Sequence, residues 1–483
     1  MDSKSFWQSL GINSEVKNRL FLLLRKFRFR EDFYLVGGCL RDLFFERKIF
    51  DLDFALKNAE NFAQFAAEKL GLKFVPLSRI FGIFRVAGKD FTLDFTELKG
   101  GSIEDDLRQR DFTINAFALP VKELFKKEAF SFIDPLGGLK DIQEKIIRAI
   151  SEDNIQQDPL RILRGYRFFA EGFGEIEALT RAMFARNKKL LVLCSPERVN
   201  YELMRILVSE RAYECFKLMD EDGVLEEVFP EIKECKGVPQ PGFHHLDVWG
   251  HMMESLGWAE EILKKPEEFL SPVLHTLPQD EDFVVSVKLA SLFHDLGKGY
   301  TFAEKEENGE KRITFYGHEK VSAELFREMG ERWRFKGDII DMVCLLVRAH
   351  MRPVHLLNEK EAGRLTLRAK RNLLRDVPHL EGLFVVAMAD SLASRGPDKE
   401  PDYEERLKAF FCELFELKKE LEEKKKKPRL ITGHDLIKLG FKPGPIFKKI
   451  LEDVEVEALA GRIRTREEAI DFVLEKYGAK DEV

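Results

Sequence analysis

The sequence has few cysteines, no long apolar run and no excess of positive charge. Its six cysteines are scattered over 483 residues without a Cys-x-x-Cys pair, which argues against a disulfide framework or a zinc ribbon. No segment approaches the length of a membrane span, and residues 1–29 show no long apolar core followed by a cleavage site. We therefore expect a cytoplasmic protein with no membrane partner.

The formal net charge of −7 does not indicate a nucleic-acid partner, so that any basic surface for RNA must be local. Charged residues make up 34% of the chain and hydrophobic residues 44%. The hydrophobic share is enough to bury cores, and the length predicts two to four domains.

The first third of the chain has mixed helix and strand patterns. Residues 5–29 have helical periodicity, residues 33–36 and 50–56 resemble strands, and residues 72–98 contain several strand-like runs. After Asp141 nearly every segment has a helical pattern. The fold class predicted from these patterns is α+β, with a mixed head followed by helices.

Two glycines and two aspartates suggest a phosphate-binding site. Gly37 and Gly38 follow a short apolar run and precede a helical stretch, so the backbone there can approach phosphates closely. Arg41 can add a charged fork to a triphosphate. Asp51 and Asp53 are two residues apart on a predicted strand, so their carboxylates share a face and suit Mg²⁺.

This order of residues, from Leu35 to Asp42 and then Asp51 to Asp53, resembles the head of class II nucleotidyltransferases. That family includes CCA-adding enzymes and bacterial poly(A) polymerases and has a polymerase-β-like sheet. The resemblance implies that Asp51 and Asp53 are the catalytic metal ligands. Asp94 remains an open candidate for a third carboxylate, because its alternation with apolar neighbours equally fits a solvent-facing residue.

Later stretches match the same family in order. The run from Arg110 through Asp111 to Asn115 resembles its second motif, which implies contacts with the triphosphate and sugar of the incoming nucleotide. Gln157-Asp158-Pro159-Leu160-Arg161 resembles its base-reading helix. Three apart on one helix, Asp158 and Arg161 can accept from and donate to a nucleobase edge. The remaining implied nucleotide-binding residues are Arg164 and Arg167, and Glu202 resembles the neck motif that braces the helix.

A second group of ligand-type residues lies in helical contexts further along the chain. The run Leu292-Phe293-His294-Asp295-Leu296-Gly297-Lys298 is specific to the HD superfamily. Imidazoles and carboxylates on separate helices suit a divalent ion. The ion is either a transition metal (Mn, Ni, Co or Fe) or Mg. The resemblance implies phosphohydrolase chemistry, with Asp295 able to bridge two ions. The predicted ligands are His251, His294, Asp295, His318, His350 and Asp390.

These matches predict four parts. They are a polymerase-β-like nucleotidyltransferase head (1–148), a helical neck resembling an RNA-binding domain (149–237), an HD phosphohydrolase domain (238–397) and a helical tail (398–483). The cluster Val238-Pro239-Gln240-Pro241-Gly242 is the main predicted junction. We expect the tail to contact tRNA, and the lysine run 424–427 either touches tRNA phosphate or is a solvated helix end.

The segment between the metal strand and the second motif indicates which member of the family this is. Residues 96–104 leave no room for the long, arginine-containing loop usual in CCA-adding enzymes. Loss of that loop resembles the CC-adding enzymes, which leave the last adenosine to a partner enzyme. We expect the tRNA 3′ end and CTP as substrates, with ATP an open possibility. The alternatives are a complete CCA-adding enzyme, a poly(A) polymerase, and an HD phosphohydrolase whose head only binds RNA.

Overall fold

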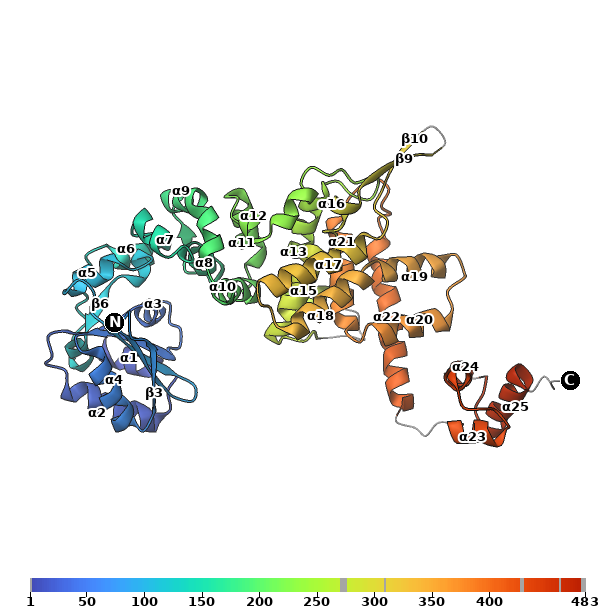
Figure 1. The fold of residues 1–483 in the computed structure, drawn as a ribbon, viewed down its shortest axis with the longest axis horizontal. Helices are drawn as coiled ribbons and strands as arrows, with labels where there is room; N and C mark the ends of the chain where they lie inside the picture. The colour runs from blue at the N-terminus through green and yellow to red at the C-terminus, as the bar shows by residue number, and fades with distance from the viewer. Residues whose placement is uncertain (1, 270–275, 308–309, 426–429, 460–461, 479–483) are drawn as a thin grey trace. The chain divides into compact units, whose positions relative to one another are not determined.

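The computed structural model describes residues 2–269, 276–307, 310–425, 430–459 and 462–478, and the chain forms two compact units (Figure 1). One unit comprises residues 1–233 and 332–335, and the other comprises residues 234–331 and 336–483. The first contains the mixed head and a set of helices, and the second is mainly helical, so the predicted fold class is confirmed. Among the described residues, no helix combines the length and apolarity that a membrane crossing requires.

The head is built on a six-stranded sheet with the strand order β3-β4-β5-β2-β1-β6. The β2–β5 pair is parallel, and the other neighbouring pairs are antiparallel. The strands are β1 (Phe33–Val36), β2 (Asp51–Leu56), β3 (Lys73–Ser78), β4 (Ile83–Ala87), β5 (Thr92–Glu97) and β6 (Ala118–Pro120).

Side-chain alternation divides this sheet into an aromatic face and a polar face. On the aromatic face, the rings of Phe54 and Phe95 stack at 5.2 Å, and Phe62 of helix α4 packs against Phe95. The opposite face carries Asp51 and Asp53, at the start of β2. The aromatic core beneath the sheet therefore fixes the strand that carries the carboxylates.

Helices of the head cover the sheet and connect its strands. The helical periodicity over residues 5–29 corresponds to two helices, because Asn13 caps the second one by accepting from the Val16 amide. The elements are α1 (Ser3–Ser9), α2 (Ser14–Lys26), α3 (Gly38–Phe44), α4 (Ala59–Leu70), α5 (Ile103–Arg108), η1 (Thr113–Asn115), η2 (Val121–Phe125) and α6 (Gly138–Glu144).

The rest of the first unit is helical apart from the short parallel pair β7 (Ile146–Ile147) and β8 (Glu175–Ile176). Helix α8 packs against α10 and α11. The helices are α7 (Glu152–Gln157), α8 (Arg161–Ala170), α9 (Ala178–Asn187), η3 (Lys188–Leu193), α10 (Pro196–Val208), α11 (Ala212–Glu221) and α12 (Leu225–Val228), with η4 (Pro230–Cys235) at the boundary between the units.

The second unit is centred on four helices, α13, α15, α18 and α21, which pack against one another. Its elements are α13 (Val248–Lys264), α14 (Pro266–Phe269), α15 (Glu281–Phe293), α16 (Lys298–Thr301), β9 (Ala303–Glu307), β10 (Glu310–Thr314), α17 (His318–Arg332), α18 (Gly337–Ala349), α19 (Met351–Glu361), α20 (Leu367–Asp376), α21 (Leu380–Ala393), α22 (Tyr403–Lys425), α23 (Gly433–Lys438), α24 (Pro445–Leu459) and α25 (Arg466–Tyr477).

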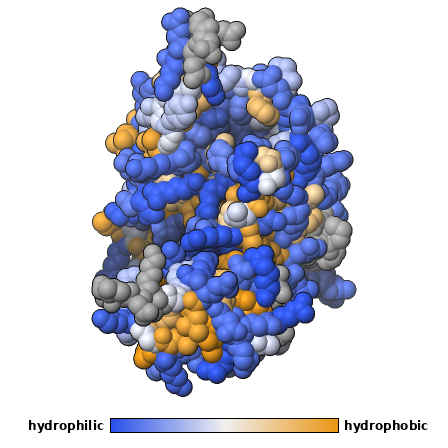
Figure 2. Space-filling view, turned by 90° about the vertical axis from the view of Figure 1, so that its right-hand side faces the viewer, coloured by the Kyte–Doolittle hydropathy of each residue, from blue (hydrophilic) through white to orange (hydrophobic). Residues whose placement is uncertain are grey.

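The last three helices enclose a small apolar cluster of their own, which includes Leu436, Ile450 and Val473. On the face drawn in Figure 2, hydrophilic residues cover most of the surface and hydrophobic residues form separate patches. Lys426 and Lys427 lie outside the described residues, so the lysine run stays a prediction. The division between units falls at 233/234, four residues before the predicted Pro/Gly junction that begins at Val238, and the four-part division remains a prediction.

Candidate functional site

The Gly37–Gly38 turn lies directly beside a carboxylate. Gly37 has a φ of +78°, a conformation that favours glycine, and a Cβ added there would lie 2.7 Å from Asp53 Oδ2. A Cβ on Gly38 would lie 3.4 Å from Arg41 Nη2. The turn therefore lies between an acidic group and a basic group, with room only for hydrogen at Gly37.

The polar face of the sheet brings three aspartates together. Thr92 donates to Asp51 at 2.7 Å, and Asp94 of β5 is the register partner of Asp53. Arg85 donates to both oxygens of Asp94 at 2.7 Å. Burial, followed by the charge of Asp94, raises the pKa of Asp53 to about 6. Asp51 and Asp53 are oxygen ligands of the kind Mg²⁺ takes, whereas Asp94 is already paired.

A chain of polar contacts joins α3 to helix α8. Arg41 Nη1 donates to Asn115 Oδ1 at 2.9 Å, and Asn115 Nδ2 donates to Asp111 at 3.2 Å. Arg164 donates to the other oxygen of Asp111 at 2.7 and 2.9 Å. Although burial opposes it, the charge of Arg164 holds the pKa of Asp111 well below its usual range. Arg41 is buried and also bonded to Asp42, so it lies under the turn and does not point into solvent.

The predicted base-reading pair does not share a helix, so that expectation is wrong. Helix α7 ends at Gln157 with Asp158 as its cap, and α8 starts at Arg161, because the intervening Pro159 lacks the amide hydrogen that would continue the first helix. Asp158 accepts from Arg198 of α10 at 2.8 Å. Arg161 donates to three backbone carbonyl groups, those of Gln109, Arg110 and Asn154.

The other predicted head residues are held by carboxylates. Arg110 donates to Asp106 at 2.9 Å. Arg167 donates to the buried Glu202 at 2.6 Å, which ties α8 to α10. Sequence reasoning missed Arg85 as the partner of Asp94, because only the fold places the two side chains next to each other.

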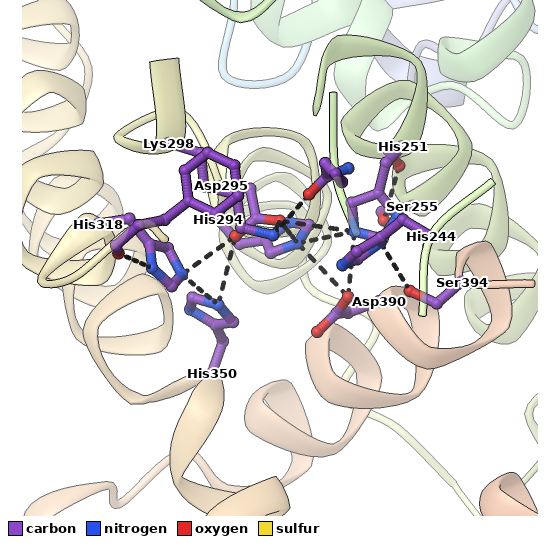
Figure 3. A network of polar contacts seen from close by, with 12 residues as sticks. His244, His251, Ser255, His294, Asp295, Lys298, His318, His350, Asp390 and Ser394 are labelled. Atoms are coloured by element: carbon purple, nitrogen blue, oxygen red, sulfur yellow. Dashed lines mark hydrogen bonds and ion pairs between the residues drawn. The ribbon is translucent and has the colours of Figure 1, made fainter. Parts of the chain in front are cut away.

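The six predicted HD ligands converge in the second unit from separate helices and helix ends (Figure 3). The Nε2 atoms of His251 and His294 are 3.3 Å apart, and Asp390 Oδ1 lies 3.1 Å from His251 Nε2. On the other side, His318 Nε2 lies 3.2 Å from Asp295 Oδ1 and 3.4 Å from His350 Nε2. Asp295 therefore directs one oxygen to each half of the cluster.

Hydrogen bonds behind the rings orient three of the histidines. The Nδ1 atoms of His294, His318 and His350 lie 2.8, 2.9 and 2.6 Å from backbone carbonyl oxygens, which makes each of them a donor. In the neutral imidazole, each Nε2 atom then presents a lone pair to the cluster. Asp295 Oδ1 is buried and has no hydrogen-bond partner among the described residues. Converging lone pairs and an unsatisfied carboxylate oxygen fit a divalent metal site.

The charges in the cluster also fit metal binding. Burial lowers the pKa of His350 to about 3, whereas the carboxylates of Asp295 and Asp390 outweigh burial and raise the pKa of His294 to about 10. Without a cation, the buried carboxylates thus hold a proton on one imidazole. Lys298 lies 2.6 Å from Asp295 Oδ2 and donates to Gln240. Lys298 stands in the predicted HD run, but sequence reasoning gave it no role.

Four family descriptions match the chain. The "Poly A polymerase head domain" matches residues 33–148, and the "Probable RNA and SrmB- binding site of polymerase A" matches residues 174–236. The "HD domain" matches residues 248–394, and a second domain of tRNA nucleotidyltransferases matches residues 403–473. Together with the site geometry, they define a nucleotidyltransferase head joined to an HD domain.

Two relatives align with nearly the whole chain. The A-adding tRNA nucleotidyltransferase of Deinococcus radiodurans is 32% identical over 91% of this chain and 94% of its own. The CC-adding tRNA nucleotidyltransferase of Thermus thermophilus is 32% identical over 93% of this chain and 95% of its own. The chain belongs to the class II tRNA nucleotidyltransferase family, in the group with an HD domain, and it is an enzyme.

Solved structures support the fold. The Thermotoga maritima CCA-adding enzyme complexed with tRNA aligns with a TM-score of 0.65 at 23% identity and covers 99% of both chains. A CCA-adding enzyme with ATP also has a TM-score of 0.65, at 22% identity, and covers 98% of this chain and 96% of its own. At these identities the likeness shows a common fold.

Proposed function

We propose that the head transfers cytidine nucleotides from CTP to the 3′ end of tRNA, releases pyrophosphate and stops after two additions. The observation that carries the stop is the short connection from β5 to α5. Both carboxylate oxygens of Glu97 accept from amides at the start of α4, at 2.8 Å, and the Lys99 amide donates to Asp106 at 3.4 Å. The connection is anchored at both of these points, which leaves no long loop to reshape the base pocket.

The residues of the head have separate roles in this reaction. The primer 3′ oxygen attacks the α-phosphorus, the bond to the β-phosphate breaks, and pyrophosphate leaves. Asp51 and Asp53 hold Mg²⁺, which when bound supplies charge neutralisation at the phosphates. The Gly37–Gly38 turn lets the backbone approach the triphosphate, and Arg110 contacts it.

The nucleotide sugar and base are bound by the second motif and the neck. Asn115, held by Asp111, contacts the sugar. Asp158 accepts from the exocyclic amine of the base, and Arg161 donates to its ring edge after releasing backbone carbonyl groups. Arg164 and Arg167 anchor α8 through Asp111 and Glu202. CTP and ATP both present an exocyclic amine, so discrimination between them depends on the size of the pocket.

We also propose that the HD domain hydrolyses phosphoesters with divalent ions held by its six ligands. His251, His294 and Asp390 lie on the side of Asp295 Oδ2, and His318 and His350 lie on the side of Oδ1. Each half of the cluster can hold one ion, with Asp295 shared. Ions held there would supply an activated water as the nucleophile, and Lys298 neutralises charge at Asp295. A transition metal such as Mn, Ni, Co or Fe fits the histidine-rich set better than Mg.

The test uses tRNA that lacks its last three nucleotides, supplied with CTP, ATP or both, followed by sequencing of the 3′ ends. We expect two added cytidines in every reaction that contains CTP, and little adenosine on tRNA that already ends in CC. Synthesis of complete CCA would identify a CCA-adding enzyme. Addition of adenosine only to tRNA that already ends in CC would identify an A-adding enzyme, and long adenosine tails would identify a poly(A) polymerase. The absence of any incorporation would favour an HD phosphohydrolase with an RNA-binding head. In the proposed pathway, a separate A-adding enzyme completes the end.

A further inference from the structure

One buried phenylalanine contacts two arginines of the head. The guanidinium carbon of Arg41 lies 3.9 Å from the centre of the Phe173 ring, and that of Arg47 lies 4.1 Å from it. Both arginines come from the segment between β1 and β2, whereas Phe173 follows helix α8. Phe173 is only 1% exposed and Arg41 is buried, so their cation–π contact forms away from water, where such contacts are strongest, whereas Arg47 is partly exposed.

Phe173 is fixed to the end of α8, and its ring also meets Phe45, which follows α3 in the head, at 5.0 Å. Its amide donates to the Phe168 carbonyl in the last turn of α8, and its ring meets Phe168 at 5.8 Å. The Phe168 ring in turn lies 4.8 Å from the Arg41 guanidinium carbon. Arg47 adds a hydrogen bond to the Glu171 carbonyl, between α8 and Phe173. Any movement of α8 therefore carries both aromatic rings that contact Arg41.

A second, polar route joins the same two elements. From α8, Arg164 donates to Asp111, Asp111 accepts from Asn115, and Asn115 accepts from Arg41. The aromatic and polar routes thus meet at the Arg41 guanidinium. Its Nη2 atom lies 3.4 Å from the Cβ position of Gly38, directly under the turn. A shift of α8 would therefore act on the Gly37–Gly38 turn through Arg41.

We propose that Phe173 is a positioning residue, which holds Arg41 beneath the Gly37–Gly38 turn and couples nucleotide binding there to the position of helix α8. This inference rests on the proposed function of the head. In it, Arg161 at the start of α8 contacts the base while the turn contacts the triphosphate. The Phe173 contacts make the two events interdependent, so binding a correct base stabilises the arrangement of the turn.

The test compares Phe173→Leu with Phe216→Leu. Phe216 of α11 is equally buried, and no arginine or lysine lies over its ring among the described residues. Nucleotide addition is measured with whichever nucleotide the wild-type protein adds to tRNA, and unfolding is measured alongside. We expect Phe173→Leu to raise the KM for the nucleotide by about three- to thirtyfold, the range of a desolvated cation–π contact, with a smaller change in kcat. Phe216→Leu should lower stability comparably and leave KM within twofold.

Two further variants make the result specific. Phe173→Tyr keeps an aromatic face and should restore most of the wild-type KM. Arg47→Met removes one of the two cations, at a partly exposed position, and should raise KM by about two- to fivefold. This variant provides the test if Phe173→Leu fails to fold. The proposal is overturned if KM is unchanged in Phe173→Leu, or if it rises equally in Phe216→Leu. If only Arg47→Met folds, an unchanged KM in that variant overturns it. Failure of the wild-type protein to add any nucleotide would instead overturn the proposed function.

Discussion

Asp53 on β2 and Asp94 on β5 are direct register partners in a parallel strand pair, and the two acidic side chains share one face of the sheet. Arg85 holds Asp94 through both oxygens, whereas no side chain donates to Asp53 among the described residues. Burial, with Asp94 beside it, raises the pKa of Asp53 to about 6. Ionised Asp53 thus lowers the stability of the fold, which is expected of a group retained for binding a cation.

Replacing Asp53 by its uncharged isostere should separate stability from activity. Because the folded-state pKa is raised, ionisation lowers stability as pH rises through about 6, and Asp53→Asn removes that cost. We expect a gain of about 1–3 kcal/mol in the free energy of unfolding at pH 8 in EDTA, which falls to about half of that at pH 5 and disappears below the unfolded-state pKa of 3.8. Nucleotide addition should fall at least a hundredfold. Denaturant unfolding at the two pH values checks this, and equal stability at pH 8 would contradict the buried charge.

The HD site should be separable from nucleotide addition. His294→Ala combined with Asp295→Ala removes a ligand from each half of the cluster, and should abolish divalent-dependent hydrolysis of a chromogenic phosphodiester and empty the site in metal analysis. Addition to tRNA should stay within about twofold. Asp51→Asn is the matched control and should show the reverse pattern. Loss of addition in a folded double variant would show that the two sites are coupled.

Arg198 should sharpen base selection by orienting Asp158, to which it donates at 2.8 Å. Arg198→Ala should lower the preference for CTP over UTP, which lacks the exocyclic amine, by about two- to fivefold, because a partly exposed ion pair contributes little. Arg205→Ala, on the same helix but paired with Glu171, is the control. Competition assays with both nucleotides give the ratio. An unchanged ratio in Arg198→Ala would mean that Asp158 is oriented without it.

Restoring a loop should change the product. Gly101 has a φ of +88° and open space around its Cβ position, whereas a Cβ at Gly100 would lie 2.4 Å from Asp105, so a flexible insert is best placed after Gly101. We expect the insert to raise adenosine addition on tRNA ending in CC. The same insert after Gly363, which is equally open and lies between α19 and α20, should have no effect. Equal products from both constructions would remove the loop as the switch.

Much of this arrangement followed from local patterns in the sequence. Alternation around Asp51 and Asp53 predicted their shared face, because the period of a strand depends only on the backbone. The His294-Asp295 run and its companion histidines predicted a convergent cluster, which the helices of the second unit bring together. Both predictions concern residues whose neighbours along the chain already constrain them.

Contacts between distant segments could not be predicted in this way. Asp158 and Arg161 appeared to share a helix, and only the turn at Pro159 with the Arg198 contact shows that they do not. The sequence predicted Arg41 as a phosphate ligand but gave no sign that packing against Phe168 and Phe173 buries it. These outcomes depend on how the neck helices meet the head, and spacing along the chain carries no information on that.

The geometry at Gly37 also limits how this protein can evolve. A side chain there would need a rarely adopted backbone conformation and would push against Asp53 Oδ2, so a substitution at Gly37 strains the turn and displaces the carboxylate. A substitution at Gly101 meets only the backbone penalty, since among the described residues no atom beyond its chain neighbours lies within 4 Å of its Cβ position. Over evolutionary time, Gly37 and the reaction that depends on it should therefore stay unchanged. The segment around Gly101, which we propose sets the length of the product, is free to vary.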